Sequence, residues 1–148
     1  MNIYNNELLG IFSLQEVLSR LNETNLTNLM LVLPVIFHKK SLNYLSHKRT
    51  NVISFQDLLL TKPELLVSLN KRYYNFLPSS LNCISLCIEN EIFELINDKV
   101  VFKKKIITDA VISTLGKRAI KIQSASLNIA TLISDNAHNI YDLCGVKL

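Results

Sequence analysis

Apolar positions near the start of the chain recur with the period of an α-helix. The segment 7–21 is predicted to be a helix, because one stripe of it collects Leu8, Ile11, Leu14 or Gln15, Leu18 and Leu21. A second helix is predicted from about residue 25 to residue 39. It is apolar almost all round, which is typical of a helix in the middle of a domain. Pro34 marks either a kink in it or a break between two short helices.

The following segments alternate between polar and apolar character. Residues 39–51 are polar and basic, and they predict a loop with one helical turn. Residues 54–60 predict a short helix. Ser54 can cap its start, because Asp57 follows three residues later, as in a capping box.

The middle of the chain shows the element order of a winged helix-turn-helix. Pro63 suits the first position of a helix over residues 63–76. A tight turn is predicted at residues 77–79, followed by a helix over residues 81–90. Strand-type residues on both sides of the pair 97–98 then predict a β-hairpin. Helix, turn, helix and hairpin together define the winged unit.

The last third of the chain returns to a helical pattern. Residues 108–134 predict one helix or two, because Gly116 and the Ser-rich patch 124–126 interrupt the pattern. A short final helix over residues 139–144 is closed by Gly145.

These elements predict a mainly α, compact helical domain that contains a winged helix-turn-helix-like unit with one small β-hairpin. The whole chain, 1–148, is expected to form a single domain. Its parts are the N-terminal helices (1–60), the winged-helix-like unit (61–105) and the C-terminal helices (106–148).

Composition adds that the chain is apolar for its size of 148 residues. It is 49% hydrophobic and 19% charged, whereas a typical domain is about 25% charged. The longest apolar stretch, residues 29–37, is about half of the roughly 20 residues that a membrane-spanning helix needs. No signal peptide is recognised. The apolar surplus therefore indicates a protein interface and an obligate subunit rather than a membrane protein.

The residues that could carry chemistry are scattered. Four aspartates are isolated and each suits a helix end: Asp57, Asp109, Asp135 and Asp142. His38 is interpreted as closing a helix C-terminus rather than as a general base. Cys83 and Cys87 are interpreted as buried, reduced thiols, which fits a cytoplasmic location. We expect no catalytic residues, no metal site and no enzyme.

Glycines are also too few and too far apart for a phosphate-binding loop. The chain has 3, at positions 10, 116 and 145. Neither a dinucleotide fingerprint nor a P-loop is therefore present, and no cofactor is expected.

The net charge of +4 is unevenly distributed. No acidic residue occurs between Thr24 and Gln56, and Asp109 is the one acid between Lys99 and Ile122. Candidates for contact with nucleic acid or with an acidic partner are Lys103, Lys104, Lys105, Lys117, Arg118 and Lys121. Lysines at strand ends can equally protect a sheet edge. The predicted recognition helix has neither Arg nor Lys, which disfavours base readout.

Three stretches resemble one known family. They are LMLVLPVIFHKK at residues 29–40, a segment at 63–95 that starts with PELL, and IYDLCGVKL at 140–148. Together they are similar to the middle component of prokaryotic three-component ABC ATPase systems, including Lamassu-type defence. The matching positions, interpreted as fold or interface positions, include Leu33, Pro34, His38, Lys39, Pro63, Leu66, Pro78, Tyr141 and Gly145.

The resemblance implies a non-enzymatic accessory subunit of an anti-phage or anti-plasmid defence complex. Such a subunit would bridge an SMC-like or Rad50-like ABC ATPase and an effector, often a nuclease, and help to keep the effector silent. DNA would be reached non-specifically, through the complex, and ATP would bind to the partner. The predicted winged unit leaves one alternative open, a free-standing winged-helix regulator that binds DNA.

Overall fold

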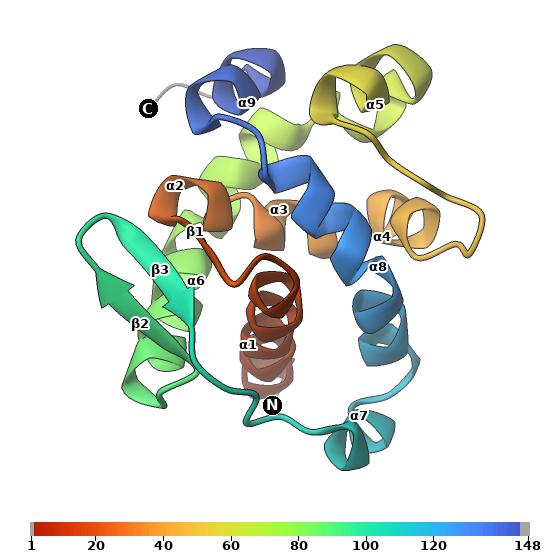
Figure 1. Cartoon of the computed structure of the whole chain (residues 1–148). Coiled ribbons are helices and arrows are strands. Elements are labelled where there is room, and N and C mark those ends of the chain that lie inside the picture. Colours follow the sequence, from red (N-terminus) through yellow and green to blue (C-terminus); the bar gives the residue numbers. More distant parts are fainter. Residues whose placement is uncertain (1, 146–148) are drawn as a thin grey trace.

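The computed structural model describes residues 2–145 and is mainly helical, with one small antiparallel sheet (Figure 1). The elements, in chain order, are α1 (Asn2–Leu21), β1 (Glu23–Asn25), α2 (Leu26–Leu29), α3 (Val32–Ile36), α4 (Lys39–Leu45), α5 (Phe55–Thr61), the 3₁₀ helix η1 (Pro63–Leu65), α6 (Leu69–Glu89), β2 (Phe93–Ile96), β3 (Lys99–Phe102), α7 (Asp109–Leu115), α8 (Lys117–Ile133) and α9 (Ala137–Cys144). The predicted class, a mainly helical fold with a small hairpin, is confirmed.

Helix α1 occupies the centre of the molecule. It packs against α6 on one side and against α8 on the other (Figure 1). Phe12, Leu14 and Leu18 on this helix are fully buried. The helix predicted over residues 7–21 is therefore confirmed, although it begins earlier, at Asn2.

The apolar segment after β1 forms two short helices, α2 and α3, which was one of the two predicted outcomes. The break falls at Met30 and Leu31 rather than at Pro34. Pro34 lies in the first turn of α3, where backbone N–H groups have no partner within the helix. Its missing N–H therefore costs little there. All five residues of α3 are buried, as its apolar character predicted.

The polar segment that follows is more helical than predicted. Helix α4 covers the first half of the predicted loop, and His38 precedes it as N-cap with an extended backbone. His38 also follows the C-cap residue of α3, Phe37, and its backbone N–H donates to the Val35 carbonyl at 3.3 Å, so it lies at a helix C-terminus as predicted and at the start of the next helix as well. Ser41, Leu42 and Leu45 form the buried side of α4. Only one side of this short helix is apolar, so its composition is similar to that of a loop.

Helix α5 agrees with the sequence-based prediction. The Ser54 hydroxyl accepts a hydrogen bond from the N–H of Asp57 at 3.0 Å, as a capping serine should. Pro63 begins a helix, also as predicted, but this helix is the single 3₁₀ turn η1. The next α-helix begins only at Leu69.

Helix α6 is continuous through Pro78, so the predicted turn at residues 77–79 is wrong. The helix-turn-helix part of the winged unit is therefore not formed. Tyr73, Ser80 and Ile84 are all buried, and their spacing places them on the same side of one helix, before and after the proline. Pro78 itself is exposed, so the backbone hydrogen bond that it removes lies on the solvent side, where water can replace it.

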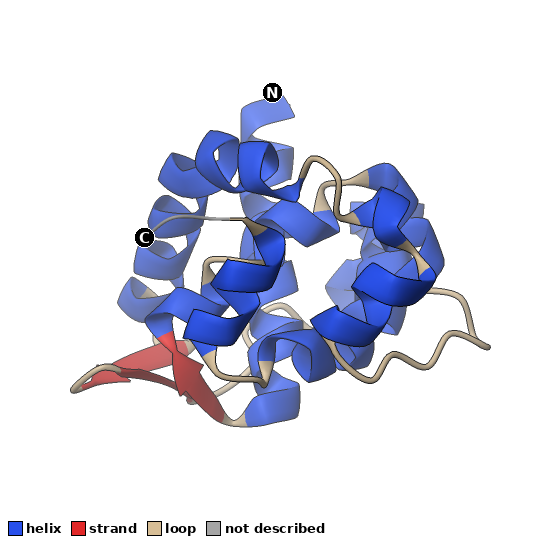
Figure 2. Ribbon diagram, turned by 90° about the horizontal axis from the view of Figure 1, so that it is seen from above, coloured by secondary structure: helices blue, strands red, loops and turns tan. Residues whose placement is uncertain are grey.

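The predicted hairpin is confirmed and belongs to a three-stranded sheet. β2 and β3 pair antiparallel, with Phe93 opposite Phe102, and Asn97 takes a positive φ of 56° in the turn. β1 adds to the other edge of β3, with Glu23 opposite Val101. This strand was missed because Glu-Thr-Asn has no apolar alternation. The sheet projects from the helical body (Figure 2).

The C-terminal helical pattern is divided at Gly116 and not at the Ser-rich patch. Gly116 has a φ of 92°, a conformation that favours glycine, and it separates α7 from α8. Gly145 is left-handed, with a φ of 71°, and closes α9 as predicted. Buried apolar residues from all parts of the described chain form one core cluster.

Candidate nucleic-acid interface

The structure divides the six predicted contact residues into two groups. Lys103 and Lys104 follow β3, and the Nζ atom of each lies 3.8 Å from a carboxylate oxygen of Glu91. Exposed ion pairs of this kind contribute little stability. They do place a negative charge beside both lysines, so the hairpin surface is less positive than the sequence indicated.

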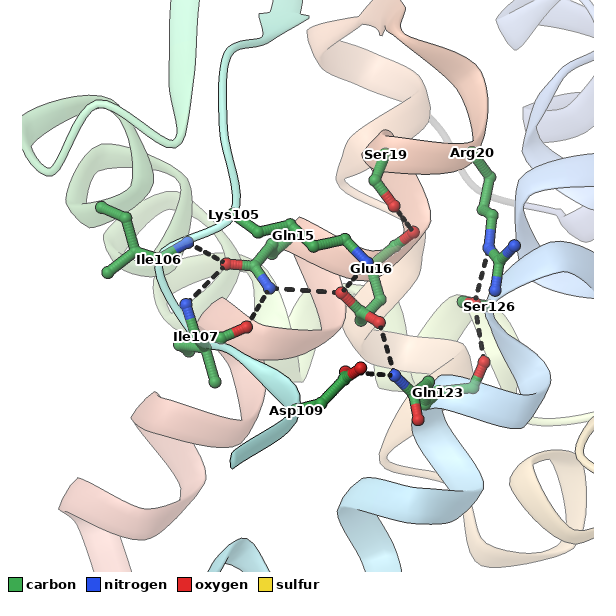
Figure 3. A network of polar contacts seen from close by, with 10 residues as sticks. All are labelled: Gln15, Glu16, Ser19, Arg20, Lys105, Ile106, Ile107, Asp109, Gln123 and Ser126. Carbon is green, nitrogen blue, oxygen red and sulfur yellow. Dashed lines mark hydrogen bonds and ion pairs between the residues drawn. The ribbon is translucent and has the colours of Figure 1, made fainter. Parts of the chain in front are cut away.

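Lys105 lies beside a buried carboxylate. Its Nζ is 3.2 Å from Oε2 of Glu16, whose side chain is only 2% exposed (Figure 3). The Gln123 amide of α8 donates to Oε1 of Glu16 and to the Asp109 carboxylate, both at 3.2 Å. Glu16 therefore links the segment after the hairpin to α1 and α8. Lys105 is itself exposed, but unlike Lys103 and Lys104 it pairs with a buried carboxylate.

The neighbouring Gln15 holds the same segment through its backbone. Its Oε1 accepts hydrogen bonds from the N–H groups of Ile106 and Ile107 at 2.9 and 3.0 Å, and its Nε2 donates to the Ile107 carbonyl at 2.8 Å (Figure 3). One fully buried amide thus satisfies three backbone groups that a loop would leave without partners. Sequence patterns do not identify this function, because Gln15 appears there only as a member of an apolar stripe.

The second group, Lys117, Arg118 and Lys121, lies at the start of α8, and Lys39 of α4 lies near it. Helix α4 packs against α8 (Figure 1). A pocket of about 430 Å³ in this seam is lined by Lys39 as well as by Lys117, Arg118 and Lys121. The Lys121 ammonium donates to Oδ1 of Asn43 at 2.6 Å. Four cationic side chains from two distant segments therefore meet at one pocket.

Both segments that meet here lack acidic residues. There are none between Thr24 and Gln56, and none in α8. In the part of the chain that the structure describes, no carboxylate lies within ion-pair distance of Lys117, Arg118 or Lys121. We call the exposed cations of α4, of the loop after it and of the start of α8 the basic face: Lys39, Lys40, Lys48, Arg49, Lys117, Arg118 and Lys121.

The Arg118 guanidinium lies over the Phe37 ring, which is itself stacked on Phe76. Its guanidinium carbon lies 4.6 Å from the centre of the Phe37 ring, within the range of a cation–π interaction. The other neighbour of Phe37 is Phe76, stacked at 5.5 Å with an interplanar angle of 8°. The stack orients a guanidinium at the surface without neutralising its charge.

The family-motif positions divide into buried and exposed ones. Leu33, Pro34, Leu66 and Tyr141 are buried, whereas Lys39, Pro63, Pro78 and Gly145 are exposed. Tyr141 donates to the Thr27 carbonyl at 2.6 Å and packs edge-on against Tyr73. The buried positions thus act in the core, and among the exposed ones Lys39 belongs to the basic face.

Arg72 is half-buried and forms several hydrogen bonds that were not predicted from the sequence. Its guanidinium donates to the carbonyls of Pro34 and Leu65, and its Nε donates to the Ser68 hydroxyl at 3.1 Å. These bonds tie α3 to the start of α6. A single arginine in a predicted amphipathic helix does not indicate from the sequence that it connects two helices.

Burial shifts the pKa values of two cysteines and one histidine away from their ordinary values. Burial, with a smaller contribution from Glu7, raises the pKa of the Cys83 thiol to about 11. Burial also raises the pKa of Cys87 to about 12. Both thiols therefore stay protonated at neutral pH, and only a thiolate is a strong nucleophile. Burial lowers the pKa of His38, assisted by Arg72 and Lys40.

Residues 2–145 contain neither a metal-binding cluster nor a membrane span. Among the side chains described within that range, no three from His, Cys, Asp or Glu lie close enough together to hold a metal ion. No helix in that range combines the length and the apolarity needed to cross a membrane.

The fold and the basic face define a small helical protein with an exposed cationic surface and a buried polar network. Residues 12–148 match the family described as ABC-three component (ABC-3C) system Middle Component 3, and the chain belongs to this family. Membership makes it one of the components of a three-component system of the ABC type. No curated protein and no solved structure matches the chain.

Proposed function

We propose that this chain is a non-enzymatic accessory subunit that bridges the ABC ATPase and the effector of its system. The observation that carries the proposal is the position of the exposed apolar residues. Leu60 and Val67, near α5 and η1, are 78% and 80% exposed, and Leu95 and Ile96 on β2 are 51% and 47% exposed. α5 and the hairpin lie on opposite sides of the molecule (Figure 1). We take each of these two pairs as an apolar patch for one partner; other exposed apolar side chains lie elsewhere, among them Ile120 and Leu127 on α8.

The system that such a subunit would serve is a cytoplasmic, Lamassu-type defence complex with a nuclease effector. In this proposal the ATPase binds and hydrolyses ATP, and the middle component transmits its state to the effector. The basic face adds non-specific contact with DNA that the complex holds, because cations along one face can follow a phosphate backbone. The alternative, a free-standing winged-helix regulator, required the turn at residues 77–79, and α6 has no turn there.

Co-purification of the three co-expressed components tests the bridge. A tagged wild-type chain should retain both partners. Leu95→Glu should lose one partner and keep the other, and Leu60→Glu should do the reverse, because each places a charge in one apolar patch. Asn70→Glu, at an exposed polar position of α6, is the matched control and should keep both. A wild-type chain that purifies as a monomer without the ATPase would disprove the proposal.

A further inference from the structure

Two pockets adjoin at the Arg118–Phe37 pair, and their linings differ in chemistry. Both are lined by Phe37 and Arg118. One is the cationic pocket of about 430 Å³ between α4 and α8. The other has about 370 Å³ and lies between α1, α3 and α6. The Arg118–Phe37 pair therefore lies between a pocket lined by several cations and a pocket lined by both apolar and polar side chains.

The second pocket, which we call the α1–α6 pocket, combines apolar walls with neutral and acidic hydrogen-bonding groups. Leu33, Phe76 and Cys83 provide the apolar lining. The Asn82 amide donates to Oε2 of Glu7 at 3.0 Å, and the other polar groups of the lining come from Asn6, Ser79 and Arg118. A carboxylate beside an amide can accept from and donate to the edge of a heterocycle. Because Glu7 offsets the charge of Arg118 here, this lining attracts a phosphate less than the cationic pocket does.

The cationic pocket has the complementary chemistry. Lys39, Lys117 and Lys121 can surround a phosphate with ammonium groups, and Arg118 can add a bidentate contact. Phe37 restrains the guanidinium on one side, which reduces the entropy lost when a ligand binds. A ligand that fills both compartments must therefore join an anionic group to a flat, partly apolar group with hydrogen-bonding edges.

We infer that the two pockets together form a site for a nucleoside monophosphate, with the phosphate between α4 and α8 and the base in the α1–α6 pocket. Arg118 lies at the junction, where it can contact the phosphate on one side and the sugar or the base on the other. This site is independent of the bridging function, because neither apolar patch contributes to it. It does share four cations with the basic face, so the test must separate a site from general attraction.

Calorimetric titration of the full chain with AMP, CMP, adenosine and inorganic phosphate tests the inference. A nucleoside monophosphate should bind at least tenfold more tightly than adenosine or phosphate alone, because only it fills both pockets. Lys121→Gln should weaken monophosphate binding by about tenfold, the usual effect of losing one charged hydrogen bond. Asn82→Leu should weaken the monophosphate but leave phosphate binding unchanged.

Lys39→Gln and Lys40→Gln form a matched pair that distinguishes a site from diffuse charge. They remove the same charge from adjacent positions of α4, but only Lys39 lines the pocket. Equal weakening by the two variants would overturn the inference, as would equal affinities for AMP and phosphate. Binding of single-stranded oligonucleotides without measurable binding of any mononucleotide would also overturn it. None of these results affects co-purification of the partners, so the bridging proposal is tested separately.

Discussion

The Lys105 ammonium lies 3.2 Å from Oε2 of Glu16, a carboxylate that is almost completely buried. The pair connects the segment after the hairpin with the central helix α1, and Gln123 attaches the same carboxylate to α8. Three parts of the fold therefore depend on one buried charge. Such a charge is costly to leave without a partner.

Lys105→Glu is expected to destabilise the fold by about 2–3 kcal/mol, because it puts a second carboxylate beside Glu16. The lysine is partly exposed, so we place the effect below that of a fully buried pair. Urea denaturation measures it. Lys104→Glu is the matched control and should change the free energy of unfolding by less than about 1 kcal/mol. Similar losses in both variants would show that the buried position of Glu16 does not matter.

Pro78→Ala is expected to stabilise the protein by about 1–3 kcal/mol. Alanine restores a backbone donor inside α6 and removes the clash of the proline ring with the preceding turn. Thermal unfolding followed by circular dichroism measures the change. Pro63→Ala, at the start of η1, serves as the comparison and should not stabilise, because a proline fits that position. A destabilised Pro78→Ala variant would indicate that residues 77–79 form a turn after all.

The features that the sequence predicted are those determined by neighbouring residues. The Ser54 cap, the hairpin turn at Asn97 and the closure of α9 by Gly145 each depend on a few adjacent positions. The features that it missed depend on distant partners. Strand β1 exists because β3 is there to pair with it, and α6 continues through Pro78 because its buried side packs against α1 and α3.

The candidate interface shows the same division. Lys117, Arg118 and Lys121 were identified because they lie in a basic stretch with a single acid, whereas their proximity to Lys39 requires the packing of α4 on α8. The lysines after β3 belong to the same acid-poor stretch of sequence but lie beside Glu91 and Glu16. The sequence therefore predicted which stretches are rich in cations. Which of these cations lie together away from carboxylates depends on the tertiary packing.

His38 is expected to make the stability depend on pH. Burial, with help from Arg72 and Lys40, lowers its pKa in the folded state below the ordinary 6.5. As the pH falls through 6.5, the unfolded chain takes up a proton that the folded chain does not, so the free energy of unfolding decreases. The contribution of His38 is complete above that pH and is lost as the pH falls towards the lowered pKa.

Urea midpoints at pH 7.5 and pH 5.5 measure this dependence. His38→Gln should show a smaller decrease between the two pH values than the wild type, because the titrating group is gone. His47→Gln, at an exposed histidine, should show the wild-type decrease. If both variants behave like the wild type, other groups cause the pH dependence.

The basic face predicts a difference between two double variants of equal charge. Lys117→Glu/Lys121→Glu should weaken binding of a labelled DNA duplex at least tenfold, and it should reduce the slope of log affinity against log salt by about 2, because two phosphates are no longer neutralised. Lys103→Glu/Lys104→Glu should have a much smaller effect, because Glu91 already lies beside both lysines. Fluorescence anisotropy of the full chain at several salt concentrations measures both. Because the two variants change the net charge equally, an equal loss of affinity would show that total charge, and not the basic face, governs binding to DNA.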